Sequence, residues 1–203
     1  MELNEIKRHL GLFTVGIAGA GGLGSNCAVS LARSGVGTLV IADYDLVEES
    51  NLSRQYYFRD QTGKYKTDAL RENILRTGSS ARVITCNTEL NKANIKNIFS
   101  GCHVIVEAFD KAEMKEMLVI TLQQELPGVP LIIASGIAGY GMNETLRCRK
   151  IDDTLYVCGD ETSDTADDIP PMAPRVGVVA NMQANLVIEL LMKMNPTQPD
   201  NLP

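Results

Sequence analysis

The amino-acid sequence predicts an α/β fold, in which a mostly parallel sheet carries helices on both faces and ends in an antiparallel hairpin. Short, continuous apolar runs alternate with helix-length segments through the first two thirds of the chain, which is the pattern of right-handed βαβ units. Beyond Gly136 the pattern changes to two shorter strand-like runs, Thr145–Arg149 and Thr154–Val157, whose short connection indicates a hairpin. Neither an internal repeat nor a linker divides the 203 residues, so we expect residues 1–203 to form a single domain.

The expected parallel strands have apolar residues that are too continuous for a half-exposed strand, so each should be buried on both faces. In chain order these strands are Phe13–Ala18, Thr38–Ala42, Arg82–Cys86, His103–Ala108 and Pro130–Ala134.

The expected helices carry apolar residues at helical spacing. The connecting helices are Gly22–Arg33, Lys66–Arg76, Lys92–Phe99 and Lys111–Glu125, and a final helix spans Arg175–Met194. The acidic stretch of residues 159–171 precedes the final helix, and we expect it to form a mobile surface loop.

The composition excludes several classes of partner. With 25 acidic and 19 basic residues the formal charge is -6, so no basic field exists to attract nucleic acid or an anionic membrane surface. The longest apolar stretches, such as Val129–Ile133, are far shorter than the roughly 18 residues that cross a bilayer, and we expect no transmembrane helix. The N-terminal residues lack the apolar core of a signal peptide, which favours a cytoplasmic protein.

The chain has five cysteines and two histidines, and it contains no C-x-x-C pair. An odd count without such pairs argues against both a disulfide framework and a zinc site. Cys27, Cys86, Cys102 and Cys148 lie on or beside apolar runs and are expected to be buried, reduced thiols. Cys158 precedes a polar stretch, so we expect it at the mouth of a loop, where its reactivity is worth testing.

A glycine-rich turn follows the first expected strand. Gly19, Gly21 and Gly24 match G-x-G-x-x-G and open the first helix, as in Rossmann-like folds, where the backbone approaches a phosphate at a helix N-terminus. Asp43 follows the second expected strand, about 20 residues further on, where a carboxylate can accept hydrogen bonds from ribose hydroxyls. These residues predict a site for an adenosine nucleotide, as an NAD-dependent oxidoreductase or an ATP-using enzyme would need.

Charged residues at the same edge of the sheet favour ATP. Arg54 and Lys66 follow the second expected strand, and a triphosphate that must release pyrophosphate needs more positive charge than a bound dinucleotide does. Either residue alone would be interpreted as a solvated surface charge. Asp110 follows the fourth expected strand, where it could hold a magnesium ion that bridges phosphate oxygens or could cap the helix that begins at Lys111.

Several specific motifs occur together along the chain. They are the glycine turn Gly19–Ser25, the segment Asp43–Gln55 with its Asn-Leu-x-Arg-Gln element, Gly63-x-x-Lys66, the Asp110 segment and Met172-Ala173-Pro174. Together they resemble the ThiF/MoeB/HesA family, relatives of the ubiquitin-activating enzymes, over most of the chain. The Asn-Leu-x-Arg-Gln element is far more specific than the glycine turn. The short length and the run of residues 170–175 are similar to the compact ThiF-like branch associated with thiamine biosynthesis.

The resemblance implies an enzyme that uses Mg-ATP to adenylate the C-terminal glycine of a small ubiquitin-like sulfur carrier, which is ThiS-like and ends in Gly-Gly, with release of pyrophosphate. It also implies a homodimer, which the apolar stripe of the final helix favours. Carried over by position, the nucleotide-binding residues are Gly19, Gly21, Gly22, Gly24, Asp43, Asn51 and Gln55, the catalytic residues are Arg54, Lys66 and Asp110, and Asp110 also serves the magnesium ion.

The sequence departs from the family pattern at three places. Two C-x-x-C pairs that bind zinc in many family members are missing, so we expect no zinc. Ala166 stands where many relatives have a cysteine for covalent intermediates, which favours adenylation without a cysteine-linked intermediate. Only Lys7 and Arg8 are available to replace an arginine that reaches across the dimer in larger relatives.

Two other functions compete with adenylation. An NAD-dependent oxidoreductase would use the glycine turn but would leave Arg54, Lys66 and Asp110 without roles. A non-catalytic scaffold, like the inactive halves of heterodimeric activating enzymes, would keep the fold and lose the site, and the presence of the same three residues argues against it.

Overall fold

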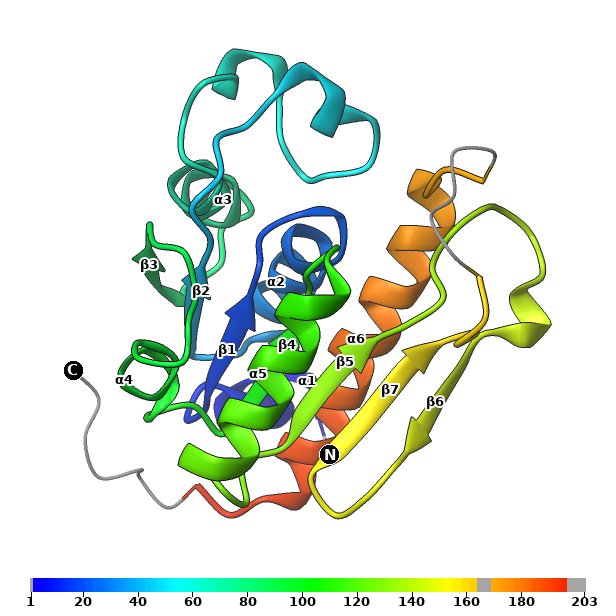
Figure 1. The fold of residues 1–203 in the computed structure, drawn as a ribbon. Helices are drawn as coiled ribbons and strands as arrows, with labels where there is room; N and C mark the ends of the chain where they lie inside the picture. Colours follow the sequence, from blue (N-terminus) through cyan, green and yellow to red (C-terminus); the bar gives the residue numbers. More distant parts are fainter. Residues whose placement is uncertain (1, 164–168, 197–203) are drawn as a thin grey trace.

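The computed structural model of the protein describes residues 2–163 and 169–196. Its sheet has seven strands in the order β3-β2-β1-β4-β5-β7-β6 (Figure 1). The strands are β1 Thr14–Ala18, β2 Thr38–Ala42, β3 Arg82–Cys86, β4 Val104–Glu107, β5 Leu131–Ala134, β6 Arg147–Lys150 and β7 Leu155–Gly159. Neighbouring strands pair in parallel except β6 and β7, which pair antiparallel. The predicted α/β fold with its antiparallel hairpin is confirmed.

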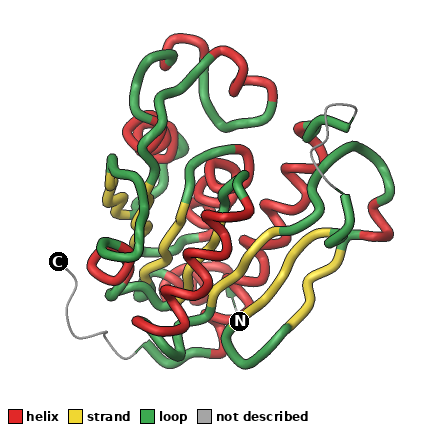
Figure 2. Tube along the Cα trace, in the orientation of Figure 1, coloured by secondary structure: helices red, strands yellow, loops and turns green. Residues whose placement is uncertain are grey.

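Helices cover both faces of this sheet (Figure 2). They are α1 Leu3–Leu10, α2 Gly22–Ser34, α3 Lys66–Arg76, α4 Ile95–Phe99, α5 Ala112–Glu125 and α6 Ala173–Lys193, with short 3-10 turns η1 Glu49–Ser53, η2 Arg59–Gln61 and η3 Asn143–Thr145. Because side chains alternate across a strand, β2 supplies Leu39 and Ile41 to one core and Val40 to the other. The first core packs against α2 and α6, and the second packs against α4 and α5.

Three elements differ from the sequence-based expectation. Helix α1 was not predicted, because its eight residues give too short a pattern; it docks through buried Leu10 and a contact of 3.1 Å between His9 Nε2 and the Leu191 carbonyl oxygen. The expected burial of β3 on both faces is wrong, since β3 is an edge strand and is half exposed. Helix α4 begins at Ile95, because the preceding residues form a turn in which the Asn94 side chain accepts a hydrogen bond from the Asn91 N–H at 2.8 Å.

Helix α6 is long and apolar enough, by length and composition alone, to cross a membrane, although the expectation of no transmembrane helix did not single it out. That expectation considered only continuous apolar runs. In α6, polar residues separate the apolar ones, and the helix still reaches the mean hydropathy of a membrane-spanning segment. In the fold, α6 packs along α2 and buries Arg175 and Gln183. Both polar side chains form hydrogen bonds inside the protein, as in the core helix of a globular domain.

The contact of α4 with β1 gives a test of the second core. Phe99 is fully buried, and a Cβ added at Gly16 of β1 would lie 2.7 Å from its ring and 3.1 Å from Cys102 Sγ, so the ring packs directly on β1. Phe99→Ala should lower the free energy of unfolding by about 3–5 kcal/mol, measured by urea denaturation. Leu75→Ala, on the exposed side of α3, is the control and should change the free energy by less than about 0.5 kcal/mol. A loss of stability in Phe99→Ala as small as that in Leu75→Ala would contradict this packing.

Candidate functional site

A cavity of about 490 Å³ opens at the carboxyl edge of the sheet, where doubly wound folds bind ligands. Its wall comes from the chain that follows β1, β2, β3, β4, β5 and β7 and from the starts of α2, α3, α5 and α6. Most of the site residues predicted from the sequence line it, namely Gly19, Gly21, Gly22, Asp43, Arg54, Gln55, Lys66 and Asp110. Gly24 and Asn51 lie outside the lining.

The glycine turn brings the backbone close to the end of β4. Gly19 has a φ of 99°, and a Cβ there would lie 2.8 Å from the Ala108 carbonyl oxygen, so glycine is required. A Cβ at Gly24 would lie 1.9 Å from the Gly19 carbonyl oxygen. Gly24 therefore allows α2 to pack against the turn and does not face a ligand. Gly21, at the N-cap of α2, provides no side-chain cap, so the first N–H groups of α2 are left for an anion.

Asp43 joins the end of β2 to the glycine turn. Its Oδ2 accepts a hydrogen bond from the Ala20 N–H at 2.6 Å, and its Oδ1 accepts one from the Asp45 N–H at 2.8 Å. Burial raises the pKa of Asp43, and the two backbone donors and the charge of Lys66 limit that rise. Each carboxylate oxygen retains a lone pair, so ribose hydroxyls can donate to Asp43 without displacing these bonds.

Arg54 and Lys66, two of the cations that line the cavity, are held differently. Lys66 is the first residue of α3, and its Nζ lies 2.7 Å from Asp45 Oδ2. Its side chain is only 7% exposed, so the ammonium needs a partner, and a bound phosphate would share it with Asp45. Among the described residues, the Arg54 side chain makes one long hydrogen bond, in which Nη1 donates to the Ser50 carbonyl oxygen at 3.4 Å. Its guanidinium therefore remains available to a ligand in the cavity.

Two side chains fix the Arg54 segment against the glycine turn. Asn26 Nδ2 donates to the Gly22 carbonyl oxygen at 2.7 Å and to the Arg54 carbonyl oxygen at 3.1 Å. The Tyr57 hydroxyl donates to the Ala20 carbonyl oxygen at 2.6 Å. The sequence analysis missed both residues. The sequence offered one signal, because asparagine is a weak helix former and Asn26 lies inside an expected helix, beside apolar positions.

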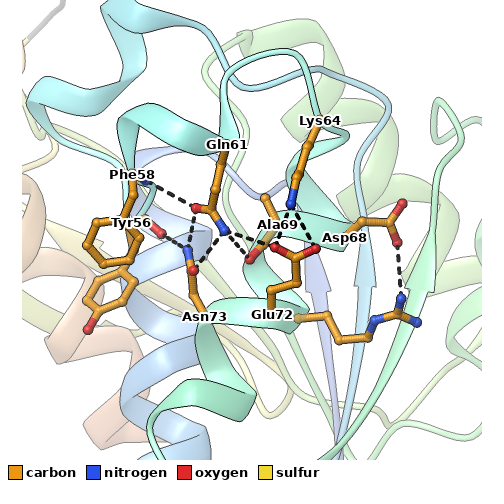
Figure 3. A network of polar contacts seen from close by, with 9 residues as sticks. Tyr56, Phe58, Gln61, Lys64, Asp68, Ala69, Glu72 and Asn73 are labelled. Atoms are coloured by element: carbon orange, nitrogen blue, oxygen red, sulfur yellow. Dashed lines mark hydrogen bonds and ion pairs between the residues drawn. The ribbon is translucent and has the colours of Figure 1, made fainter.

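A pair of buried amides holds α3 to the same segment (Figure 3). Gln61 and Asn73 exchange side-chain hydrogen bonds, both of 2.9 Å. Asn73 also donates to the Tyr56 carbonyl oxygen at 2.8 Å, and the Phe58 N–H donates to Gln61 at 3.1 Å. Because α3 begins with Lys66, these amides fix the spacing between Lys66 and Arg54.

Gln55 and Asn51, both expected near phosphates, occupy different positions. Gln55 lines the cavity and is 9% exposed, and its Oε1 is buried with no hydrogen-bond partner among the described residues. A buried acceptor of this kind is costly unless a ligand or water donates to it. Asn51 is directed into η1 instead, where its Oδ1 accepts a hydrogen bond from the Glu48 N–H at 3.1 Å. It stabilises the turn that leads to Arg54.

Glu107, which the sequence analysis did not single out, is fully buried at the end of β4. Its carboxylate accepts hydrogen bonds from Lys115 Nζ at 2.8 and 3.0 Å and from the N–H groups of Phe109 at 2.6 Å and Ala134 at 3.3 Å. Burial raises the pKa of Glu107, and the charge of Lys115 limits that rise. Lys115 lines the cavity, so this ion pair joins β4, β5 and α5 directly beside the candidate site.

A second buried ion pair fixes the rim of the cavity after β7. Arg175 Nη2 lies 2.5 Å from Asp160 Oδ2, and Asp160 Oδ1 accepts hydrogen bonds from the Thr162 and Ser163 N–H groups, both at 2.8 Å. Burial would raise the pKa of Asp160, but these backbone donors and Arg175 lower it overall. The expected mobile loop begins here. Its residues 164–168, including Ala166, lie outside the described part of the chain.

Asp110 faces the cavity beside the start of α5. Lys111 is the N-cap of α5, and no side-chain hydrogen bond of Asp110 occurs among the described residues, so the alternative capping role is wrong. The described residues contain no cluster of three or more His, Cys, Asp or Glu side chains that could hold a metal ion. A cation at Asp110 would therefore need oxygens from a ligand, which is how protein sites usually hold Mg²⁺ with nucleotides.

Three cysteines differ from expectation. Cys158 is fully buried on β7 and does not lie at a loop mouth, whereas Cys148 is exposed on β6. The reason is that β6 is the last strand of the sheet and lacks a neighbour on one side. Cys27 and Cys102 are buried as predicted, and burial raises the pKa of Cys27 to about 12. Cys86 is only partly buried, because it lies on the other edge strand.

Comparison with known proteins identifies relatives across almost the whole chain. The model of the ThiF family matches residues 4–202. The adenylyltransferase and sulfurtransferase MOCS3 of Caenorhabditis briggsae is 29% identical over 198 residues, covering 94% of this chain and 48% of the relative. The sulfur carrier protein ThiS adenylyltransferase of Bacillus subtilis is 31% identical over 173 residues, covering 80% of this chain and 50% of the relative. The chain thus spans about half the length of these relatives.

Solved structures share the fold. The Escherichia coli tRNA N6-threonylcarbamoyladenosine dehydratase TcdA in complex with AMP superposes with a TM-score of 0.83 at 17% identity, covering 93% of this chain and 90% of that chain. Escherichia coli MccB with ATP superposes with a TM-score of 0.70 at 23% identity, covering 96% of this chain and 60% of that chain. At these identities the likeness concerns the fold.

The buried carboxylate beside the cavity gives a pH-dependent prediction. Lys115→Met leaves Glu107 without a counter-charge and should lower the free energy of unfolding by about 3–5 kcal/mol at neutral pH. Since burial raises the pKa of Glu107 above its unfolded value, the folded state binds the proton more tightly, and stability falls as pH rises between these two values. The loss should therefore shrink as pH falls toward the unfolded pKa of about 4.3. Urea denaturation across this pH range measures it.

The matched control is Lys96→Met, which removes a surface ion pair with Glu125. It should cost less than about 1 kcal/mol, with little dependence on pH. Adding Glu107→Gln to Lys115→Met should recover part of the loss. A loss in Lys115→Met that grows as the pH falls would contradict this account of the ion pair.

Proposed function

Because the chain belongs to the ThiF family, we propose that it is an adenylyltransferase that uses Mg-ATP to activate the C-terminal glycine of a small ubiquitin-like sulfur carrier, with release of pyrophosphate. A ThiS-like carrier ending in Gly-Gly, and thus a role in thiamine biosynthesis, is the specific form of this proposal. The name of the Bacillus subtilis relative and the motifs of the sequence support it.

The observation that carries the proposal is the convergence of Asp43, Arg54, Lys66 and Asp110 on one cavity beside the uncapped start of α2. In the proposed reaction, a carboxylate oxygen of the carrier attacks the α-phosphorus of ATP, and the bond from that phosphorus to the bridging oxygen of the pyrophosphate breaks. The carboxylate is already ionised at neutral pH, so no general base is needed. Alignment and charge neutralisation supply the catalysis.

Each residue has a distinct task in this reaction. Asp43 holds the ribose hydroxyls, and Gln55 supplies an acceptor or, through its amide N–H, a donor near the phosphates. Arg54 and Lys66 stabilise the negative charge that grows on the leaving pyrophosphate. Asp110 would hold Mg²⁺ together with phosphate oxygens, and the bound ion would add further charge neutralisation.

We also propose that the protein is a cytoplasmic homodimer. Membership of the ThiF family supports this dimer. Light scattering at working concentration should give the mass of two chains. A monomer mass there would reject the dimer and leave the adenylation site unaffected.

Replacing Arg54 and Lys66 tests the chemistry. Arg54→Ala and Lys66→Ala should each reduce carrier-dependent exchange of pyrophosphate into ATP by on the order of a hundred- to a thousandfold at saturating ATP, because their interactions strengthen in the transition state. ATP affinity should fall much less.

Lys64→Ala and Arg59→Ala are the matched controls, since both residues lie in the same stretch of chain but form surface ion pairs outside the cavity. They should leave exchange nearly unchanged. Asp110→Ala should need more magnesium for its residual activity. Exchange near the unmodified rate in both cavity variants would show that adenylation does not occur at this site.

Nucleotide choice separates this proposal from an NAD-dependent oxidoreductase. ATP should bind far more tightly than NADH, and Asp43→Ala should weaken ATP binding by removing the ribose acceptor. Isothermal titration calorimetry of both nucleotides measures the difference. NADH that binds as tightly as ATP would overturn the adenylation proposal.

A further inference from the structure

Cys148 and Cys158 face each other across the antiparallel pair of β6 and β7. Their Sγ atoms lie 2.9 Å apart. The Ile151 N–H donates to the Leu155 carbonyl oxygen at 2.8 Å, and ladder bonds recur at every second pair, so Cys148 and Cys158 form a non-hydrogen-bonded pair. Cα atoms in such pairs are about 4.5 Å apart, which lies within the range that a disulfide spans.

The two thiols differ in access. Cys148 is exposed and lies in an open groove beside α6, where a small molecule can reach its sulfur. Cys158 is fully buried in the core directly behind it. The hydrogen bond from Cys158 lowers the pKa of Cys148, while the same contact and burial raise the pKa of Cys158. The accessible sulfur is thus the better nucleophile of the two.

The other cysteines lack this arrangement. Cys27 and Cys102 are buried in the two cores, and burial raises the pKa of each thiol. Cys86 is partly exposed, but burial still raises its pKa, and no cysteine pairs with it in the sheet register. An attacking thiol with a second thiol in contact occurs at Cys148 alone among these residues.

We propose that Cys148 and Cys158 form a redox-active dithiol that hydrogen peroxide oxidises to an intrachain disulfide, with Cys148 as the attacking thiol and Cys158 as the resolving thiol. The Cys148 thiolate attacks one peroxide oxygen, the O–O bond breaks, and the leaving hydroxide takes a proton and becomes water. Cys158 then attacks the sulfenic sulfur of Cys148, the S–O bond breaks, and hydroxide leaves with the proton of Cys158 as a second water. Two thiols lose two electrons in total, and the peroxide gains them.

This site is separate from the proposed adenylation chemistry, because neither cysteine lines the nucleotide cavity. The sulfur atoms are already in contact in the folded hairpin, so closing the bond needs only a small movement of two side chains. The oxidised protein should therefore keep its fold, and a small dithiol should restore both thiols.

Native oxidation followed by peptide mapping tests the proposal. The folded protein is treated with one equivalent of hydrogen peroxide, alkylated, digested without reductant and analysed by mass spectrometry. We expect a linked peptide pair that contains Cys148 and Cys158, lighter by two hydrogen atoms than the sum of the two peptides, and dithiothreitol should abolish it. Brief iodoacetamide treatment of the reduced protein should label Cys148 before the other cysteines.

Two variants complete the test. Cys158→Ser removes the resolving thiol, so Cys148 should stop at the sulfenic acid, which dimedone traps. Cys86→Ser is the matched control and should still form the disulfide to the same extent. Circular dichroism before and after oxidation reports whether the fold is kept. No linked pair in folded protein, or first labelling at Cys86, would overturn the proposal.

Discussion

The buried carboxylate of Glu107 is the constraint on which the cavity depends. It lies where β4 ends, and it joins the backbone of two strand ends to Lys115 of α5. The carbonyl oxygen of the same residue accepts a hydrogen bond from Gln183 of α6 at 2.9 Å. A buried charge is tolerated only when hydrogen bonds and ion pairs satisfy it. The contacts of Glu107 therefore hold β4, β5, α5 and α6 in fixed positions relative to one another. Moving β4, β5 or α5 would leave that charge without a partner, and moving α6 would break the hydrogen bond between Gln183 and the Glu107 carbonyl oxygen.

The cavity separates groups that face a ligand from groups that hold them. Asp43, Arg54 and Lys66 line the cavity. Asp43 and Arg54 lie in segments outside the regular strands and helices, and Lys66 is the first residue of α3. Their positions depend on side chains outside the lining, among them Asn26, Asn73 and Tyr57. Irregular chain can present ligand-binding groups at a fixed spacing only if its backbone polar groups are bonded in this way.

The sequence predicted features that depend on local spacing. The bounds of β2, β3 and α3 and the glycine turn with Asp43 all follow from patterns within a few tens of residues. Sequence reasoning missed Glu107, Arg175 and Asn26, because each acts through a partner that only the folded chain brings near, such as Gln183, which is 76 positions from Glu107. It also misplaced Cys148 and β3, since edge positions are set by strand order and not by the composition of the strand.

The pairing of Lys66 with Asp45 explains how a buried cation can await a phosphate. An unpaired ammonium that is 7% exposed would cost several kcal/mol, and the ion pair with Asp45 offsets that cost. The half-exposed Asp45 loses little when its partner turns toward a stronger anion, because water can solvate its carboxylate. The ammonium thus has an anionic neighbour both before and after a phosphate binds. Arg54 complements Lys66. Its guanidinium can be solvated by water without a protein partner, so it can donate two parallel hydrogen bonds to the ligand.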